Sequence, residues 1–136
     1  MAVKVLTNAL ITIAGTDLST RANTVTLNYE VDSVEVTAFG DSGHKFTGGL
    51  QNLSVDITLM QDYAALNVEV VVYPLVGVGT TTLIIRADSG AVSATNPTYT
   101  ISNAFLAAHT PVQGAVGELA TTSLTFTGGT IVKTTA

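Results

Sequence analysis

Hydrophobic and polar residues alternate along much of this chain with the two-residue period of a half-buried β-strand. The inward face of the clearest run, residues 51–60, would be Leu53, Val55, Ile57 and Leu59. Similar runs predict strands over residues 9–14, 23–31, 33–39, 80–87, 99–109, 118–127 and 130–133. Gly128 and Gly129 favour a tight hairpin turn between the last two. Antiparallel strands separated by turns about every dozen residues predict a mainly β sandwich or barrel.

The period changes after residue 61. Asp62 is placed to N-cap a helix over residues 63–73, which Pro74 would end. The apolar positions on one face of this helix would be Tyr63, Leu66 and Val70. Residues 68–72 are β-branched enough to form a strand instead, and the short helix is the interpretation that we favour.

The chain is unusually apolar for a small β-protein. Of its 136 residues, 46% are hydrophobic and 11% are charged, and the mean hydropathy is +0.45. Ordinary soluble domains carry about 25% charged residues. The length suits a single domain over residues 1–136. So few charges indicate a protein with little permanently free surface, which is typical of a subunit in an assembly.

Charge and cysteine content narrow the classes of function. The net charge of −5, with scattered basic residues, argues against a groove that grips nucleic-acid phosphates. The absence of cysteine excludes disulfides and thiol chemistry. The N-terminus lacks the long apolar stretch of a signal peptide, so we expect the protein to stay in the producing cell until assembly or lysis. No apolar run approaches the length that spans a bilayer, so we expect no membrane partner.

Catalytic and metal-binding chemistry has little support in the sequence. The two histidines, His44 and His109, lie in different contexts, and no metal-ligand spacing is present. The carboxylates of Asp41 and Asp62 have no recognisable partner for acid–base work. An Asx-type turn explains Asp41 better. We therefore expect no enzyme activity, no metal and no cofactor.

The connection between the strands at 33–39 and 51–60 is long for a hairpin. Residues 39–49 contain four glycines and two phenylalanines, whereas a simple hairpin needs about two to five residues. Aromatic residues on an exposed loop usually pack on their own domain or dock on a partner. A flexible tip is one interpretation, and a docking segment is the one that we favour. Its candidate residues are Phe39, Gly40, Asp41, Ser42, Gly43, His44, Lys45 and Phe46.

Several short stretches occur in the order typical of one protein family. They are VEVTAFGDSGH at residues 34–44, GGL at 48–50, LSVDI at 53–57, MQDY at 60–63, NP at 96–97, and Pro111 followed by GAVGE at 114–118. Together they resemble the major tail proteins, or tail tube proteins, of long-tailed (siphovirus-like) bacteriophages. The resemblance extends from about residue 10 to residue 126.

The resemblance implies both a fold and a function. The fold would be two packed antiparallel sheets forming a β-sandwich or barrel with one short flanking α-helix. Such proteins form hexameric rings that stack into a tube, and genomic DNA passes through it into the host without specific binding. Residues 40–45 would stack the rings, and arms at about 1–8 and 128–136 would contact the next ring. Tape-measure and tail terminator proteins would be partners in a virion tail that is assembled in the host cytoplasm.

The chemistry of the sequence is consistent with such an assembly. Closing copies into a ring would cover open sheet edges and bury apolar surface. An acidic lumen would repel phosphate and let DNA slide. Two polar strand faces are candidates for the lumen, and the pattern alone leaves open whether each faces the lumen or the exterior. Their residues are Thr24, Thr26, Asn28 and Glu30 on one strand, and Ser54, Asp56 and Thr58 on the other.

Two other classes of function stay open at this point. One is a minor virion protein at the tail tip, the tail-completion site or the capsid surface. The other is an immunoglobulin-like binding module, which usually has a Cys–Trp–Cys core and aromatic residues on its binding surface. The chain has neither cysteine nor tryptophan and is only 6% aromatic, which disfavours the binding module.

Overall fold

The computed structural model describes residues 3–136, and this part of the chain is mainly β with one short α-helix. The strands are β1 (Leu10–Ile13), β2 (Thr16–Asp17), β3 (Ala22–Glu35), β4 (Phe46–Met60), β5 (Thr81–Arg86), β6 (Thr98–His109), β7 (Thr121–Thr127) and β8 (Thr130–Thr134). The helix is α1 (Val68–Val72), and two 3-10 turns are η1 (Ser19–Arg21) and η2 (Tyr73–Leu75). The strands pair antiparallel, which confirms the predicted fold class.

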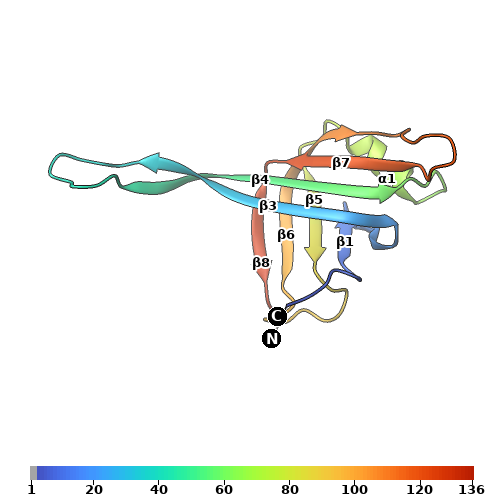
Figure 1. The fold of residues 1–136 in the computed structure, drawn as a ribbon, viewed down its shortest axis with the longest axis horizontal. Helices are drawn as coiled ribbons and strands as arrows, with labels where there is room; N and C mark the ends of the chain where they lie inside the picture. Colours follow the sequence, from blue (N-terminus) through green and yellow to red (C-terminus); the bar gives the residue numbers. More distant parts are fainter. Residues whose placement is uncertain (1–2) are drawn as a thin grey trace.

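Two sheets run crosswise to each other and share one strand (Figure 1). The first sheet has the order β3-β4-β7-β6, and the second has the order β2-β1-β5-β6-β8. β6 belongs to both, because residues 98–102 pair with β8 and residues 105–109 pair with β7. Sheets that pack crosswise make their corners with strands that pass from one sheet to the other. No helix within residues 3–136 is long and apolar enough to cross a membrane.

The chain turns two corners where the sheets meet. Asn103 has a left-handed backbone (φ 59°) in the middle of β6. Gly128 and Gly129 carry the chain from β7 in the first sheet to β8 in the second. A Cβ at Gly129 would overlap the carbonyl oxygen of Ser102, and φ is 90°, so only glycine fits. The predicted tight hairpin at these glycines is wrong, because β8 pairs with β6 and not with β7.

The hydrophobic core lies between the inner faces of the two sheets. Leu53, Val55, Ile57 and Leu59 are at most 1% exposed, which confirms the inward face predicted for residues 51–60. They form one cluster with side chains of the other strands, among them Ile13, Leu83, Ile101, Leu124 and Phe126. Fully burying such a side chain contributes about 1.5–3 kcal/mol, so this cluster holds the two sheets together.

The helix is shorter than predicted and begins later. Its N-cap is Asn67, so the predicted capping role of Asp62 is wrong. Leu66, just before the cap, has a left-handed backbone (φ 61°), which interrupts a helix at that point. Val68 and Val72 are fully buried one turn apart, and their burial fixes the inward face. The residues predicted for that face are exposed: Tyr63, Leu66 and Val70.

Asp62 instead anchors the chain between β4 and α1. Its carboxylate accepts hydrogen bonds from the backbone N–H of Ala64 (2.9 Å) and from Nε of Arg21 in η1 (2.9 Å). The backbone donor at Ala64 and the Arg21 guanidinium together lower the pKa of Asp62 below its usual value of 3.8. The segment before the helix is therefore fastened to η1.

The C-terminal end of the chain differs from the predicted arm, whereas the N-terminal arm stays a prediction. Residues 3–8 form an exposed stretch before β1, and residues 1–2 of the predicted N-terminal arm lie outside the described part. At the other end, β8 pairs along its length with β6. Most of the predicted arm at 128–136 is therefore part of the second sheet, since that strand has backbone partners in its own copy.

Candidate assembly surfaces

A long hairpin formed by the outer ends of β3 and β4 projects from the molecule (Figure 1). We term residues 31–50 the distal hairpin. In Figure 1 it extends to the left, well beyond the body in which the two sheets pack. It therefore lies outside the hydrophobic core, and its side chains have no second sheet to cover them.

The two strands of the distal hairpin stay paired far along its length. The last ladder pair is Glu35 with Phe46, and the backbone N–H of Val36 then donates to the carbonyl of Lys45 (2.8 Å). The predicted loop at 39–49 is wrong for its last four residues, because β4 already begins at Phe46. The predicted strands at 23–31 and 33–39 form one strand that ends at Glu35.

A bulge bends the hairpin where it leaves the body. The register shifts between Val31 and Ser33, so Gly49 and Leu50 on β4 face the single residue Asp32 on β3. A Cβ at Gly49 would lie 3.1 Å from Cγ2 of Val34 and 3.3 Å from Cβ of Asp32. Bulges increase the local right-handed twist, and the two strands visibly cross at this part of the hairpin (Figure 1).

The tip of the distal hairpin is ordered around Asp41. One carboxylate oxygen accepts from the backbone N–H of Ala38 (2.8 Å), and the other lies 2.8 Å from Nζ of Lys45. The backbone N–H of Asp41 donates in turn to the carbonyl of Ala38 (3.1 Å). The ammonium of Lys45, followed by the Ala38 N–H, lowers the pKa of Asp41 below 3.8. A turn role for Asp41 fits these contacts, although its carboxylate reaches back three residues and not forward two as in an Asx turn.

A second set of polar contacts closes the base of the tip. The Nδ1 of His44 lies 2.5 Å from a carboxylate oxygen of Glu35. The hydroxyl of Thr37 donates to the same oxygen (3.1 Å) and accepts from the backbone N–H of Lys45 (3.0 Å). These contacts hold the backbone between β3 and β4 in one conformation, so the aromatic side chains at the tip have defined positions.

The apolar side chains of the distal hairpin are open to solvent. Phe39 is fully exposed, Phe46 is 61% exposed and Leu50 is 80% exposed. Val34 and Val36 are also about half exposed. Neighbouring apolar side chains without cover usually mark an interaction site. Phe39 and Phe46 were predicted docking residues, whereas the exposure of the two valines and Leu50 follows only from the projection of the hairpin.

The structure brings together all seven residues predicted as lumen candidates. Thr24 pairs with Thr58, Thr26 with Asp56 and Asn28 with Ser54, and directly opposite partners share one face of a sheet. The pattern had predicted two separate faces, and they are one. β7 extends the face with Ser123, Thr125 and Thr127, which pair with Thr58, Asp56 and Ser54. We term these ten residues the polar face: Thr24, Thr26, Asn28, Glu30, Ser54, Asp56, Thr58, Ser123, Thr125 and Thr127.

The polar face is acidic and rich in hydroxyl groups. Its ionisable side chains are Glu30 and Asp56, both exposed, and it contains no lysine, arginine or histidine. The hydroxyl of Thr125 donates to Asp56 (3.2 Å), and the amide of Asn28 donates to Glu30 (3.3 Å). The surface potential over this face is therefore negative, and the remaining groups are small, uncharged and hydrated.

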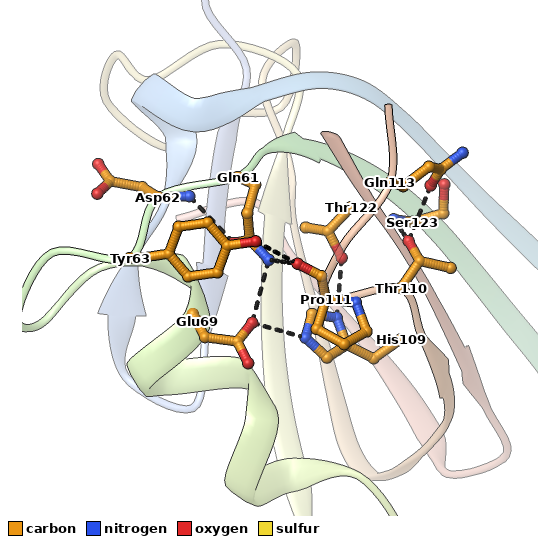
Figure 2. Close-up of polar contacts among 10 residues, drawn as sticks. All are labelled: Gln61, Asp62, Tyr63, Glu69, His109, Thr110, Pro111, Gln113, Thr122 and Ser123. Atoms are coloured by element: carbon orange, nitrogen blue, oxygen red, sulfur yellow. Dashed lines mark hydrogen bonds and ion pairs between the residues drawn. The ribbon is translucent and has the colours of Figure 1, made fainter. Parts of the chain in front are cut away.

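A buried polar network ties the helix to the end of the first sheet (Figure 2). The Nε2 of His109 lies 3.0 Å from a carboxylate oxygen of Glu69, and its Nδ1 lies 2.8 Å from the hydroxyl of Thr122. The amide of Gln61 donates to the same Glu69 oxygen (3.0 Å) and to the carbonyl of Pro111 (2.7 Å). We term Gln61, Glu69, His109 and Thr122 the polar clamp. It joins α1 and the residue directly after β4 to β6 and β7 at one end of the body.

The centre of the polar clamp is closed off from solvent. The side chain of His109 is 3% exposed and Thr122 is fully buried, so neither can reach a dissolved molecule. Across residues 3–136, no group of three or more His, Cys, Asp or Glu side chains is arranged to hold a metal ion. The sequence carries no signal for this cluster, because Glu69 and His109 are 40 residues apart and share no motif.

Known proteins resemble this chain in structure and not in sequence. No family model matches it, and no curated protein matches it. The sheath/tube terminator of an extracellular contractile injection system (PVC) matches with a TM-score of 0.71 and 14% identity, over 96% of this chain and 95% of that one. The sheath–tube complex of the same system matches with a TM-score of 0.67 and 13% identity, over 95% of this chain and 89% of that one. The tube-terminating cap of the anti-feeding prophage matches with a TM-score of 0.68 and 14% identity, over 95% of this chain and 89% of that one.

At these identities the likeness concerns the fold alone. It covers nearly the whole chain in all three comparisons, so the body, the hairpin and the crosswise sheets belong to one tail-tube-like fold. The resemblance found in the sequence is confirmed at that level. A specific relation to the major tail proteins of siphoviruses stays a prediction.

Proposed function

We propose that this protein is the subunit of a phage-type tail tube, in which rings of six copies stack around a central channel. The observation that carries the proposal is the distal hairpin, because it holds exposed apolar side chains away from a body that already has its own core. The tail-tube-like fold supports the proposal, since the matched proteins come from tube and tube-terminating assemblies.

The distal hairpin would join one ring to the next. Each large apolar side chain that becomes fully covered would contribute about 1.5–3 kcal/mol, and Phe39, Phe46 and Leu50 are available on every copy. The hairpin of one copy would meet a different surface on another copy, and a contact of this heterologous kind can repeat without limit. The stacking role thus covers the predicted docking residues from Phe39 to Phe46.

The polar face would line the channel. Each copy would contribute the carboxylates of Glu30 and Asp56 and no basic group from this face, so a ring would present a negative wall to DNA. Proteins hold DNA through lysine and arginine contacts to phosphate, and a wall without them lets DNA slide past. The hydroxyl groups between the acids would keep this wall hydrated.

This role makes the protein a structural component of a virion tail or similar particle, without catalysis or cofactor. Its main partner would be further copies of itself. A tape-measure protein inside the channel and a terminator protein at the end of the tube would be its other partners, and the tail would be assembled in the host cytoplasm.

The proposal is tested by shortening the distal hairpin. Val36 and Lys45 are already hydrogen-bonded (2.8 Å), so replacing residues 37–44 with Asn-Gly leaves a two-residue hairpin turn. We expect this variant to keep the circular dichroism spectrum of the parent and to stay monomeric. The unchanged protein should form hollow tubes with ring striations in negative-stain electron microscopy across a concentration series.

A pair of single substitutions serves as the matched control. Phe39→Leu keeps an apolar side chain and should still form tubes, whereas Phe39→Ser should form few or none. Tubes formed by the shortened variant would contradict the stacking role. Single rings that never stack, formed by the unchanged protein, would favour a terminator-like function over a tube subunit.

A further inference from the structure

An open groove lies between β3 and the second sheet. β3 is the outermost strand of the first sheet, and its inward side chains Val25 and Leu27 are only half-buried, whereas β4 buries its own completely. The groove has a volume of about 430 Å³ and is walled mainly by apolar side chains, including Leu6, Ile85 and Ile131. The core of the body is therefore incompletely covered along one side.

The size of the groove suits the aromatic residues of the distal hairpin. A cavity of about 150 Å³ holds one benzene ring, so this groove has room for roughly two aromatic side chains. Phe39 and Phe46 stand on the two sides of the hairpin tip, and both are largely exposed. One molecule thus carries an apolar projection and an apolar recess with room for its aromatic side chains.

The charges of the two surfaces are also complementary. The walls of the groove contain one basic residue, Arg86, and no acidic residue. The distal hairpin carries three carboxylates, from Asp32, Glu35 and Asp41, against one lysine. A hairpin that enters the groove would bring net negative charge toward Arg86. This attraction favours the groove as the receiving surface over an acidic surface such as the polar face, which would repel the hairpin.

The hairpin of a molecule extends away from its own body (Figure 1), so it leaves its own groove empty. We propose that the groove between β3 and the second sheet receives the distal hairpin of a second copy, with Phe39 and Phe46 inside it. The inference rests on the proposed tube function and assigns the surface that accepts the hairpin. In this arrangement β3 forms one strand of the distal hairpin at its outer end and one wall of the groove that receives the hairpin of another copy.

A groove-filling substitution gives the first test. Ala87 lines the groove and is partly buried, whereas Ala94 is exposed and lies outside it. Ala87→Trp should reduce tube assembly at least tenfold, as measured by sedimentation and electron microscopy, and Ala94→Trp should leave it unchanged. Circular dichroism must show both variants folded. Normal tubes from a folded Ala87→Trp protein would overturn the inference.

Cross-linking between two complementary variants gives the second test, and the absence of native cysteine makes it clean. One variant combines Ser42→Cys, at an exposed position of the tip, with Ala87→Trp, so it keeps both phenylalanines and has a filled groove. The other combines Leu27→Cys with the shortened hairpin, so it has a groove and no tip. Mixed under oxidising conditions, the two should give a covalent one-to-one dimer that cannot grow further.

A matched control replaces Leu27→Cys with Leu119→Cys, an exposed apolar site outside the groove. We expect at least tenfold more dimer with the cysteine in the groove. Equal or greater cross-linking at residue 119, or none at either site, would overturn the inference. The tube proposal would survive that result if hairpin shortening still abolishes tubes, and it would fail separately if the shortened protein assembles.

Discussion

β3 and β4 pass through two different surroundings, and the same kind of side chain has opposite outcomes in them. Within the body, Leu53 and Val55 on β4 are 1% exposed. On the same strand within the distal hairpin, Leu50 is 80% exposed and Phe46 is 61% exposed. Alternating hydrophobic and polar residues therefore specify a strand, whereas burial of its apolar face requires a second surface that packs against it. In the body the second sheet is that surface, and the hairpin has no such surface within its own copy.

The largest contrast is expected from truncating one leucine in each region. Leu53→Ala should lower the free energy of unfolding by about 2–5 kcal/mol, because it leaves a cavity in the core. Leu50→Ala should change it by less than about 0.5 kcal/mol, because the side chain has no cover in one copy. Urea denaturation, followed by circular dichroism at concentrations too low for assembly, measures both. A similar loss for the two variants would show that the hairpin is packed.

Substitutions of one glycine in the body and one in the distal hairpin should give the next largest difference in stability. Gly129→Ala places a Cβ onto the backbone of Ser102 at a positive φ and should cost about 3 kcal/mol of stability. Gly49→Ala meets a methyl group of Val34 and the Cβ of Asp32 at slightly tight distances, and the exposed hairpin can widen there. We expect a cost below about 1 kcal/mol for Gly49→Ala in the same denaturation experiment. A larger cost at Gly49 than at Gly129 would contradict the assignment of the rigid corner.

Removing the buried histidine of the body and the exposed histidine of the distal hairpin should give a smaller difference in stability. His109→Ala removes the centre of the polar clamp, which leaves Thr122 without its partner and Glu69 with Gln61 as its remaining partner, and should cost about 1–3 kcal/mol. His44→Ala removes an exposed contact with Glu35 and should cost less than about 0.5 kcal/mol. Thermal unfolding of both variants measures the difference. Equal shifts in Tm would mean that the clamp contributes no more than a surface contact.

The smallest expected effects concern two carboxylates with lowered pKa values. At Asp41 the main cause is Lys45, whereas at Asp62 it is the backbone N–H of Ala64, with Arg21 second. Lys45→Gln should therefore raise the pKa of Asp41 toward 3.8 more than Arg21→Gln raises the pKa of Asp62. Carboxyl NMR titrations of the two variants and the parent measure this. Because both folded-state pKa values are depressed, the stability they give is present above pH 3.8 and is lost as the pH falls through the lower folded values.

Local periodicity predicted those parts of the fold that depend on a single strand and its own inward face. The run of Leu53, Val55, Ile57 and Leu59 is such a case, and its burial is as expected. The pairing of β8 with β6 could not be predicted in this way, because Gly128 and Gly129 permit both a hairpin and a corner. The structure has the corner, in which Gly129 packs closely against Ser102, and this contact joins residues far apart in the sequence.

The helix and the candidate sites show the same limit. Asp62 has the chemistry of an N-cap, yet burial of Val68 and Val72 moved the helix start to a later turn. The two polar faces were each visible as alternating residues, and only the register of β3 with β4 unites them. The phenylalanines of the distal hairpin stand out in the sequence as candidates by their residue type, whereas the exposed groove depends on β3 being an edge strand.

The course of β4 has a mechanical consequence for any tail built through the distal hairpin. The strand continues from the projection into the middle of the first sheet, where β3 and β7 flank it. Tension applied along the hairpin would therefore run parallel to the strands and load their cross-strand hydrogen bonds together, in shear. A pull across the strands would open the bonds one after another, as in unzipping. Stretching along the hairpin would thus meet the most resistant direction of the subunit, and bending would fall on the narrow two-stranded ribbon that projects from the body.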